Sequence, residues 1–165
     1  MFVIGSESIA GIRMKKIALL PVWVIVCSLA GVFGAQFEPG IWYEVLQKPN
    51  WTPPNWVFPV VWPILYVMMG TSGWLIWRED AMSLSDYEFK WFFVQLILNA
   101  LWSWLFFGKH YISTGLAEIL LLWIAIAFTL LLFWKKNRIA GLLLVPYLLW
   151  ISYASALNFA IWQLN

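Results

Sequence analysis

Five apolar runs, each about 20 residues long, occupy most of this chain of 165 residues, and polar connections separate them. An apolar run of this length crosses the hydrocarbon core of a bilayer as a helix. The runs lack the strict alternation of a barrel strand, and helices satisfy their own backbone hydrogen bonds in lipid. We therefore predict an all-α integral membrane protein, a bundle of five transmembrane helices, at about 16–36, 55–77, 89–107, 112–134 and 139–162.

The composition also indicates lipid rather than water as the surroundings of the chain. Hydrophobic residues make up 63% of it and charged residues only 11%, whereas about 25% of the residues of an average soluble domain are charged. The net charge of +2 is small, and the basic residues form no single patch, so we expect no nucleic-acid partner. The single cysteine, Cys27, excludes an intramolecular disulfide.

The basic residues are distributed unequally between the two ends of the predicted helices. Only Lys48 and Lys109 lie in the first and third connections, and the other eight of the ten lie near the N-terminus or in the second and fourth connections. Basic residues favour the cytoplasmic side of a membrane. We therefore expect a cytoplasmic N-terminus in a prokaryotic cell membrane, with the chain forming one domain, 1–165, that begins with a frayed tail, 1–15.

The stretch Trp42–Trp77 joins a loop rich in proline and tryptophan to the second predicted helix. Within that helix Trp62, Tyr66 and Gly70 recur at four-residue spacing, so they share one helical face. Glycine allows a second backbone to approach closely, and the two rings beside it are placed to line a space. Spacing alone leaves two interpretations of the rings open, packing and a ligand wall. The long loop, 37–54, is interpreted as a lid over a pocket.

Polar side chains inside the predicted helices are the next candidates for function. An unpaired polar group in hydrocarbon is costly, so we expect Asn99 and Asn158 to face the interior of the bundle. They either join helices by hydrogen bonds or contact the polar edge of a ligand. Glu118 is the only acidic residue inside a predicted span. It either has a function, as intramembrane ionisable residues commonly do, or reaches the membrane interface.

No set of residues for conventional catalysis or metal binding is recognisable in the sequence. The only histidine, His110, lies in a predicted loop, where an ordinary loop residue is favoured over an axial ligand of a porphyrin iron. There is no Gly-rich phosphate loop, no Ser-His-Asp set and no pair of intramembrane carboxylates. We therefore predict no metal and no resident cofactor.

Four longer motifs are distinctive when taken together: WYEVLQKPNWTPP at 42–54, VVWPILYVMMG at 60–70, QLILNALWSWLFFG at 95–108 and LLVPYLLWISYASALNFAIWQLN at 143–165. They resemble the translocator-protein family (TspO/MBR), whose members are also called tryptophan-rich sensory proteins or peripheral-type benzodiazepine receptors. The resemblance covers about residues 20–165, and within the family the chain is similar to a prokaryotic member. It implies a five-helix bundle in the lipid bilayer, often a homodimer, with one pocket under the first long loop.

The resemblance also implies a ligand and the residues that would contact it. Members bind porphyrins (tetrapyrroles), and some bind sterols or benzodiazepine- and isoquinoline-type compounds, so a receptor, sensor or carrier is the first functional prediction. The alternative is a light-dependent porphyrin-degrading enzyme with Trp62 and Trp150 as its catalytic residues. The resemblance and the spacing together predict a set of ligand-binding residues, which is Tyr43, Pro53, Trp62, Tyr66, Asn99, Trp150, Ala154 and Leu157.

Two departures from the family pattern bear on the ligand. The sterol-recognition pattern requires a tyrosine and a basic residue where this chain has Phe159 and Gln163, which favours a porphyrin over a sterol. Animal members carry a tryptophan four residues before the acidic position of the fourth helix, where this chain has Thr114 and then Glu118. Their drug selectivity is therefore not carried over. Gly31 and Gly34 in the first helix are candidates for a dimer contact, since small residues permit close approach.

Overall fold

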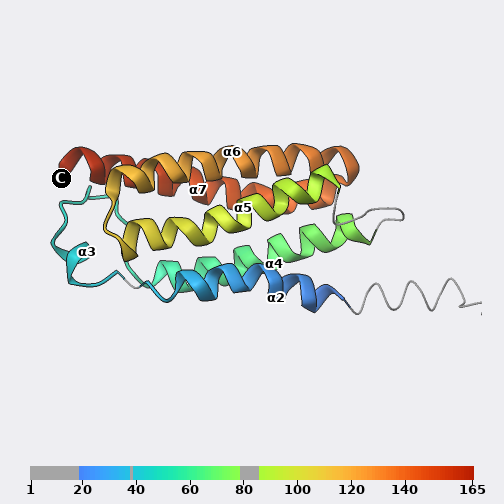
Figure 1. The fold of residues 1–165 in the computed structure, drawn as a ribbon, viewed down its shortest axis with the longest axis horizontal. Coiled ribbons are helices and arrows are strands. Elements are labelled where there is room, and N and C mark those ends of the chain that lie inside the picture. Colours follow the sequence, from blue (N-terminus) through green and yellow to red (C-terminus); the bar gives the residue numbers. More distant parts are fainter. Residues whose placement is uncertain (1–18, 38, 79–85) are drawn as a thin grey trace, which may run out of the picture.

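The computed structural model describes residues 19–37, 39–78 and 86–165, and these ranges contain helices and no β-strand. The predicted tail, 1–15, lies outside the described residues, as do the expected start of the first span and most of the second connection. The described helices are α2 (Leu20–Gly34), α3 (Ile41–Val45), α4 (Val57–Trp77), α5 (Tyr87–Ser103), the π-helix η1 (Trp104–Gly108), α6 (Ile112–Lys136) and α7 (Arg138–Leu164) (Figure 1).

Four of these helical segments are long and apolar enough to cross a membrane: α4, α5 continued by η1, α6 and α7. Helix α2 is also apolar, but its 15 residues are fewer than the roughly 20 that span a bilayer without tilt or thinning. The prediction of an all-helical chain with several membrane-spanning helices is confirmed. The count of five spanning helices stays a prediction.

The helix ends differ from the predicted ones by a few residues, for local reasons. Helix α7 begins at Arg138 because Asn137 caps it, its side-chain oxygen accepting hydrogen bonds from the backbone N–H groups of Ile139 (2.9 Å) and Ala140 (3.1 Å). Helix α4 begins at Val57 rather than at residue 55. The loop 37–54 is not wholly irregular, since it contains the short helix α3.

The basic residues are distributed unequally between the two ends of the folded bundle, as they are between the connections in the sequence. The C-terminal end of α4, the N-terminal end of α5 and the α6–α7 connection lie at one end of the bundle, and α3 and the C-terminus lie at the other (Figure 1). At the first end Lys136 pairs with Glu88 at 3.5 Å. The described basic residues of that end are Arg78, Lys90, Lys135, Lys136 and Arg138, whereas Lys48 and Lys109 belong to the α3 end.

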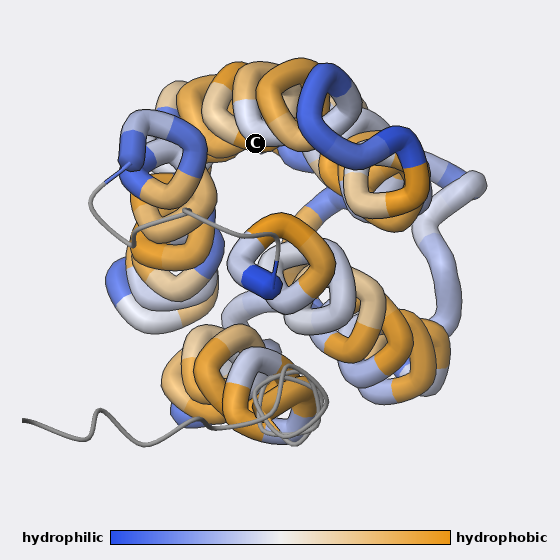
Figure 2. Tube along the Cα trace, turned by 90° about the vertical axis from the view of Figure 1, so that its right-hand side faces the viewer, coloured by the Kyte–Doolittle hydropathy of each residue, from blue (hydrophilic) through white to orange (hydrophobic). Residues whose placement is uncertain are grey.

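Large apolar side chains cover the outer surface of the bundle. Ile25 and Leu29 of α2, Ile97 of α5 and Leu149 of α7 are each more than half exposed. Seen along the helix axes, hydrophobic residues occur on the outward faces of the helices as well as between them (Figure 2). Such a surface is unfavourable in water and favourable in lipid, which is consistent with helices that cross a membrane.

Glycines bring α2 into close contact with its neighbours. A β-carbon placed at Gly70 of α4 would lie 2.6 Å from the Cα atom of Val24, so the two backbones touch. The close approach predicted at Gly70 is therefore confirmed, and its partner is α2. Gly31 packs against the ring of Tyr66, and Gly34 lies against Ser103. Both candidate dimer glycines therefore face helices of the same chain.

Replacing Gly70 by alanine should destabilise the bundle by about 1–3 kcal/mol, because the backbone of Val24 has no room to retreat from the added methyl group. Thermal unfolding of the purified protein in detergent measures this loss. Gly40→Ala is the matched control, since a β-carbon there meets nothing within 4 Å. A Gly70→Ala protein as stable as the control would contradict the proposed contact between backbones.

Candidate ligand-binding pocket

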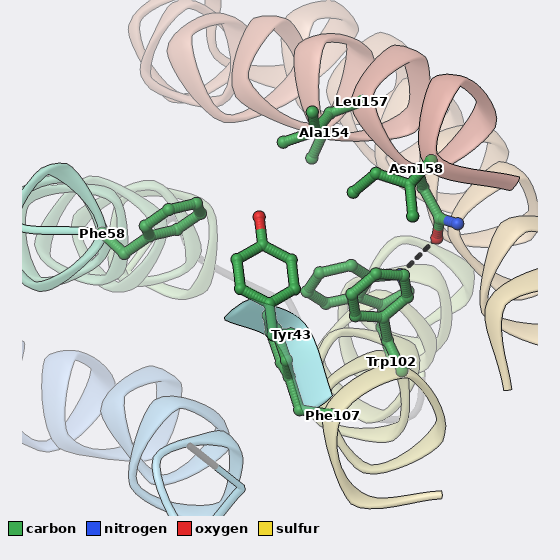
Figure 3. Close-up of a pocket in the computed structure, with 9 residues that line it drawn as sticks. Tyr43, Phe58, Trp102, Phe107, Ala154, Leu157 and Asn158 are labelled. Atoms are coloured by element: carbon green, nitrogen blue, oxygen red, sulfur yellow. Dashed lines mark hydrogen bonds between the residues drawn. The ribbon is translucent and has the colours of Figure 1, made fainter. Parts of the chain in front are cut away.

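A cavity lies beneath α3, between α4, the α5–η1 segment and α7 (Figure 3). Its empty volume is about 300 Å³, including the part that is open to solvent. Aromatic rings form most of its wall, and one amide and a tyrosine hydroxyl add polar groups. The lining residues are Tyr43, Phe58, Trp102, Phe106, Phe107, Ala154, Leu157, Asn158 and Ile161.

Tyr43 of α3 is the lid residue that enters the cavity. It is only 5% exposed, and its ring packs edge-on against Phe107, with 5.5 Å between ring centroids. The ammonium group of Lys48 lies 4.7 Å from the centroid of the same ring and donates hydrogen bonds to the carbonyls of Tyr43, Glu44 and Leu46. Lys48 therefore caps the C-terminal carbonyl groups of α3 and holds Tyr43 in place.

Three further contacts fasten the loop that carries α3 to the bundle. The backbone N–H and C=O of Gln47 both hydrogen-bond the side-chain amide of Asn165, each at 3.0 Å. The hydroxyl of Tyr153 donates to the carbonyl of Trp51 at 2.8 Å. Trp42 stacks on His110 of the η1–α6 connection, with ring centroids 4.3 Å apart. The loop is thus attached to α7 and to the η1–α6 connection.

The π-helix η1 explains how two consecutive phenylalanines line one cavity. Phe106 follows Trp102 at four-residue spacing and stacks on it at 5.2 Å. The wider turn of a π-helix, which often occurs at functional sites, brings the next residue, Phe107, to the cavity as well. The helical spacing of Trp102 and Phe106 was a usable signal in the sequence, but the π-turn that adds Phe107 was not.

Asn99 joins three helices deeper in the bundle. Its side-chain oxygen accepts a hydrogen bond from the hydroxyl of Tyr66 on α4 at 2.8 Å. Its amide nitrogen donates to the hydroxyl of Tyr147 on α7 at 3.0 Å. Trp62 stacks on Tyr66 at 5.4 Å and meets Tyr147 edge-on at 6.3 Å. Asn99 therefore makes the hydrogen bonds between helices that one of its two interpretations predicted.

Asn158 has a similar role at the edge of the cavity. Its oxygen accepts from the indole N–H of Trp102 at 3.3 Å, and its amide nitrogen donates to the carbonyl of Ile112 at 3.1 Å. Asn158 therefore connects α7 to α5 and to the start of α6, and it also faces the cavity. The sequence predicted that Asn158 faces the interior of the bundle but did not include it among the ligand-binding residues.

The predicted ligand-binding residues fall into separate places. Tyr43, Ala154 and Leu157 line the cavity. Trp150 does not, but its ring meets that of the lining residue Phe58 edge-on at 5.8 Å. Trp62, Tyr66 and Asn99 belong to the deeper cluster, and Pro53 lies in the loop outside the lining. Their role in ligand binding stays a prediction. The lining residues that the prediction missed are Phe58, Trp102, Phe106, Phe107, Asn158 and Ile161.

Replacing Asn99 by leucine should destabilise the protein more than replacing Tyr66 by phenylalanine. The first change leaves the hydroxyls of Tyr66 and Tyr147 buried without their amide partner, at about 1–3 kcal/mol for each, whereas the second leaves one group, the side-chain oxygen of Asn99, without its donor. Unfolding in detergent, followed by circular dichroism, compares the two. Equal losses of stability would show that the bond to Tyr147 contributes nothing.

Comparison with known proteins agrees with this architecture. Residues 19–163 match the TspO/MBR family. The chain is 40% identical to the protein CrtK of Rhodobacter capsulatus, over 91% of this chain and 94% of that protein. It is 43% identical to the tryptophan-rich protein TspO of Chlorobaculum tepidum, over 92% and 98%, and 35% identical to the translocator protein of Bos taurus, over 89% and 94%. The chain therefore belongs to the TspO/MBR family and is an integral, multi-pass membrane protein.

Proposed function

We propose that this protein binds a porphyrin in the cavity beneath α3 and acts as a receptor, sensor or carrier for it. The observation that carries the proposal is a cavity inside the helix bundle with an aromatic wall and a covering loop. A tetrapyrrole is a large, flat and mostly apolar ring, and aromatic side chains offer such a ring extensive contact. Relatives named "tryptophan-rich sensory protein" and "translocator protein" are compatible with sensing or moving a ligand.

The size of the cavity indicates that the loop must move to admit this ligand. Ligand pockets have volumes of roughly 300–1,000 Å³, whereas the 300 Å³ of this cavity counts all the space between its atoms and the part open to solvent, so the enclosed space is far below that range. Tyr43 lines the cavity on the side that the loop covers, and its side chain is buried there. Displacement of Tyr43 together with α3 enlarges the space without disturbing the cluster around Asn99. In this proposal the structure represents the closed form of the site, in which the loop covers the cavity.

The same proposal includes the arrangement in the membrane. The charge asymmetry of the bundle supports a cytoplasmic N-terminus and an outer position for the α3 end. Family membership supports a bundle of five spanning helices and a homodimer. Sterols and benzodiazepine- or isoquinoline-type compounds are further ligand classes that an apolar aromatic cavity would accept.

Binding is favoured over light-dependent degradation by the positions of the two tryptophans. Trp62 stacks on Tyr66 in the deeper cluster, and Trp150 meets the ring of Phe58 edge-on. Neither ring lines the cavity, so neither would touch a ligand held there in the closed form.

Titration with protoporphyrin IX should quench the tryptophan fluorescence of the purified protein saturably. Ala154→Leu should weaken binding about tenfold, because the larger side chain fills the cavity beside Leu157. The matched control is Ala156→Leu, two residues away on the exposed side of the same helix. Equal affinity of both variants and the wild type would place the ligand elsewhere, and quenching that never saturates would refute the proposal.

Tyr153→Phe should accelerate porphyrin binding about fivefold, because it removes one hydrogen bond of the loop, worth about 1 kcal/mol, and retains the ring that contacts Trp51. Stopped-flow quenching measures the association rate. Tyr87→Phe, an exposed tyrosine at the other end of the bundle, is the control and should bind at the wild-type rate. An unchanged rate in Tyr153→Phe would mean that opening of the loop does not limit entry.

A further inference from the structure

Three basic side chains at one end of the bundle have no acidic partner among the described residues. Lys90 lies near the start of α5, Lys135 lies in the last turn of α6, and Arg138 is the first residue of α7. All three are exposed, and none forms an ion pair within the described part of the chain. This end of the bundle, here called the basic end, therefore offers cations to an anionic partner.

Lys135 stands at the end of an exposed apolar stripe on α6. Leu131, Phe128 and Ile124 precede it at spacings of three and four residues, so the four side chains share one helical face. All three apolar side chains are exposed. From Lys135 to Ile124 the helix rises about 16 Å, which is about half of the hydrocarbon core of a bilayer. The stripe is therefore about as long as one leaflet is deep.

The same pattern occurs on α7 and α5. On α7, Leu142 and Leu149 follow Arg138 on one helical face. On α5, Ile97 follows Lys90 at two-turn spacing. These three apolar side chains are each more than half exposed. On all three helices, an exposed apolar face thus ends in a cation at the basic end.

The direction of the helices helps these cations to reach the membrane surface. Both α5 and α7 begin at the basic end, and side chains lean towards the N-terminus of their helix. Lys90 and Arg138 therefore lean towards the headgroups, as long basic side chains near a helix end commonly do. Figure 2 looks onto this end and shows strongly hydrophilic residues at the α6–α7 connection, next to helices that are largely hydrophobic.

At the opposite end, the basic side chains of the described residues are engaged with the protein itself. Lys48 donates hydrogen bonds to three carbonyl groups of α3 and the residue after it. Lys109 lies over the ring of Trp104, with its ammonium group 5.5 Å from the ring centroid. Anionic groups are therefore attracted mainly to the leaflet at the basic end.

We propose that the basic end binds anionic phospholipids, with a headgroup phosphate at each of Lys90, Lys135 and Arg138 and an acyl chain along the apolar stripe of the same helix. The cation and the stripe match the two parts of such a lipid, whereas a soluble anion would use the cation alone. A basic residue near a membrane surface strengthens binding of an anionic lipid about fivefold. This proposal is independent of the ligand cavity, which lies at the α3 end.

Native mass spectrometry of the whole protein in detergent tests the proposal, with phosphatidylglycerol and phosphatidylcholine of identical acyl chains as probes. The wild type should bind phosphatidylglycerol about fivefold more tightly than phosphatidylcholine in its first three binding events. Lys90→Gln, Lys135→Gln and Arg138→Gln should each lose one of these events, and the triple variant should bind both lipids equally. Circular dichroism checks that each variant remains helical.

Lys109→Gln is the matched control, because it removes a cation at the other end of the bundle, and it should bind both lipids as the wild type does. A wild type that binds the two lipids equally overturns the proposal. An unchanged preference in the triple variant does the same, as does a loss in Lys109→Gln equal to that in Lys135→Gln.

Thermal unfolding of the wild type distinguishes a lipid from a soluble anion. Phosphatidylglycerol should raise the midpoint of unfolding more than phosphatidylcholine does, and about 1 M salt should remove the difference by screening the cations. Inorganic phosphate should leave the midpoint where chloride of the same ionic strength leaves it. A rise with inorganic phosphate equal to the rise with phosphatidylglycerol would show that the acyl chain contributes nothing and would overturn the proposal.

Discussion

The two hydrogen bonds of Asn99 are the interaction on which the rest of the structure depends. They connect α4, α5 and α7 at one point through Tyr66 and Tyr147. Apolar side chains cannot specify such a point in a membrane, because lipid is as apolar as they are. A buried amide can, since an unpaired polar group in hydrocarbon excludes other arrangements of the helices. The three helices are thereby held at defined positions relative to one another.

A fixed interior and a removable cover follow from this arrangement. Below the cavity, helices meet through the Asn99 cluster and through backbone contact at Gly70. Above it, α3 is attached by a few hydrogen bonds and ring contacts at one end of the bundle. Motion is therefore expected in the loop rather than between the spanning helices. Tyr43 is the element that such motion moves out of the cavity.

Predictions from the sequence were most successful for features that the lipid environment determines, such as the length of a spanning helix. The length of the apolar runs predicted α4, α5, α6 and α7, and helical spacing predicted the contact at Gly70. The family motifs named Tyr43, Ala154 and Leu157, and these three residues line the cavity, while their role in ligand binding stays a prediction. Sequence reasoning could not foresee that Phe107 lines the cavity, because no pattern in the sequence indicates the π-turn of η1, nor that Phe58 lines the cavity while Trp150, which contacts it, does not. Both features depend on how the helices rotate and pack against one another, and the periodicity of a single helix gives no information on this.

The fastening of the loop has a consequence for how freely its sequence can change. The hydrogen bonds of Asn165 and Tyr153 to the loop are made with backbone groups of Gln47 and Trp51, and one side-chain contact, between the rings of Tyr153 and Trp51, accompanies them. Every residue offers the same carbonyl, and every residue except proline the same N–H. The side chains at these two loop positions are thus exchangeable without loss of the hydrogen bonds. The amino acids at these two positions can therefore vary while the same hydrogen bonds keep the loop attached to α7.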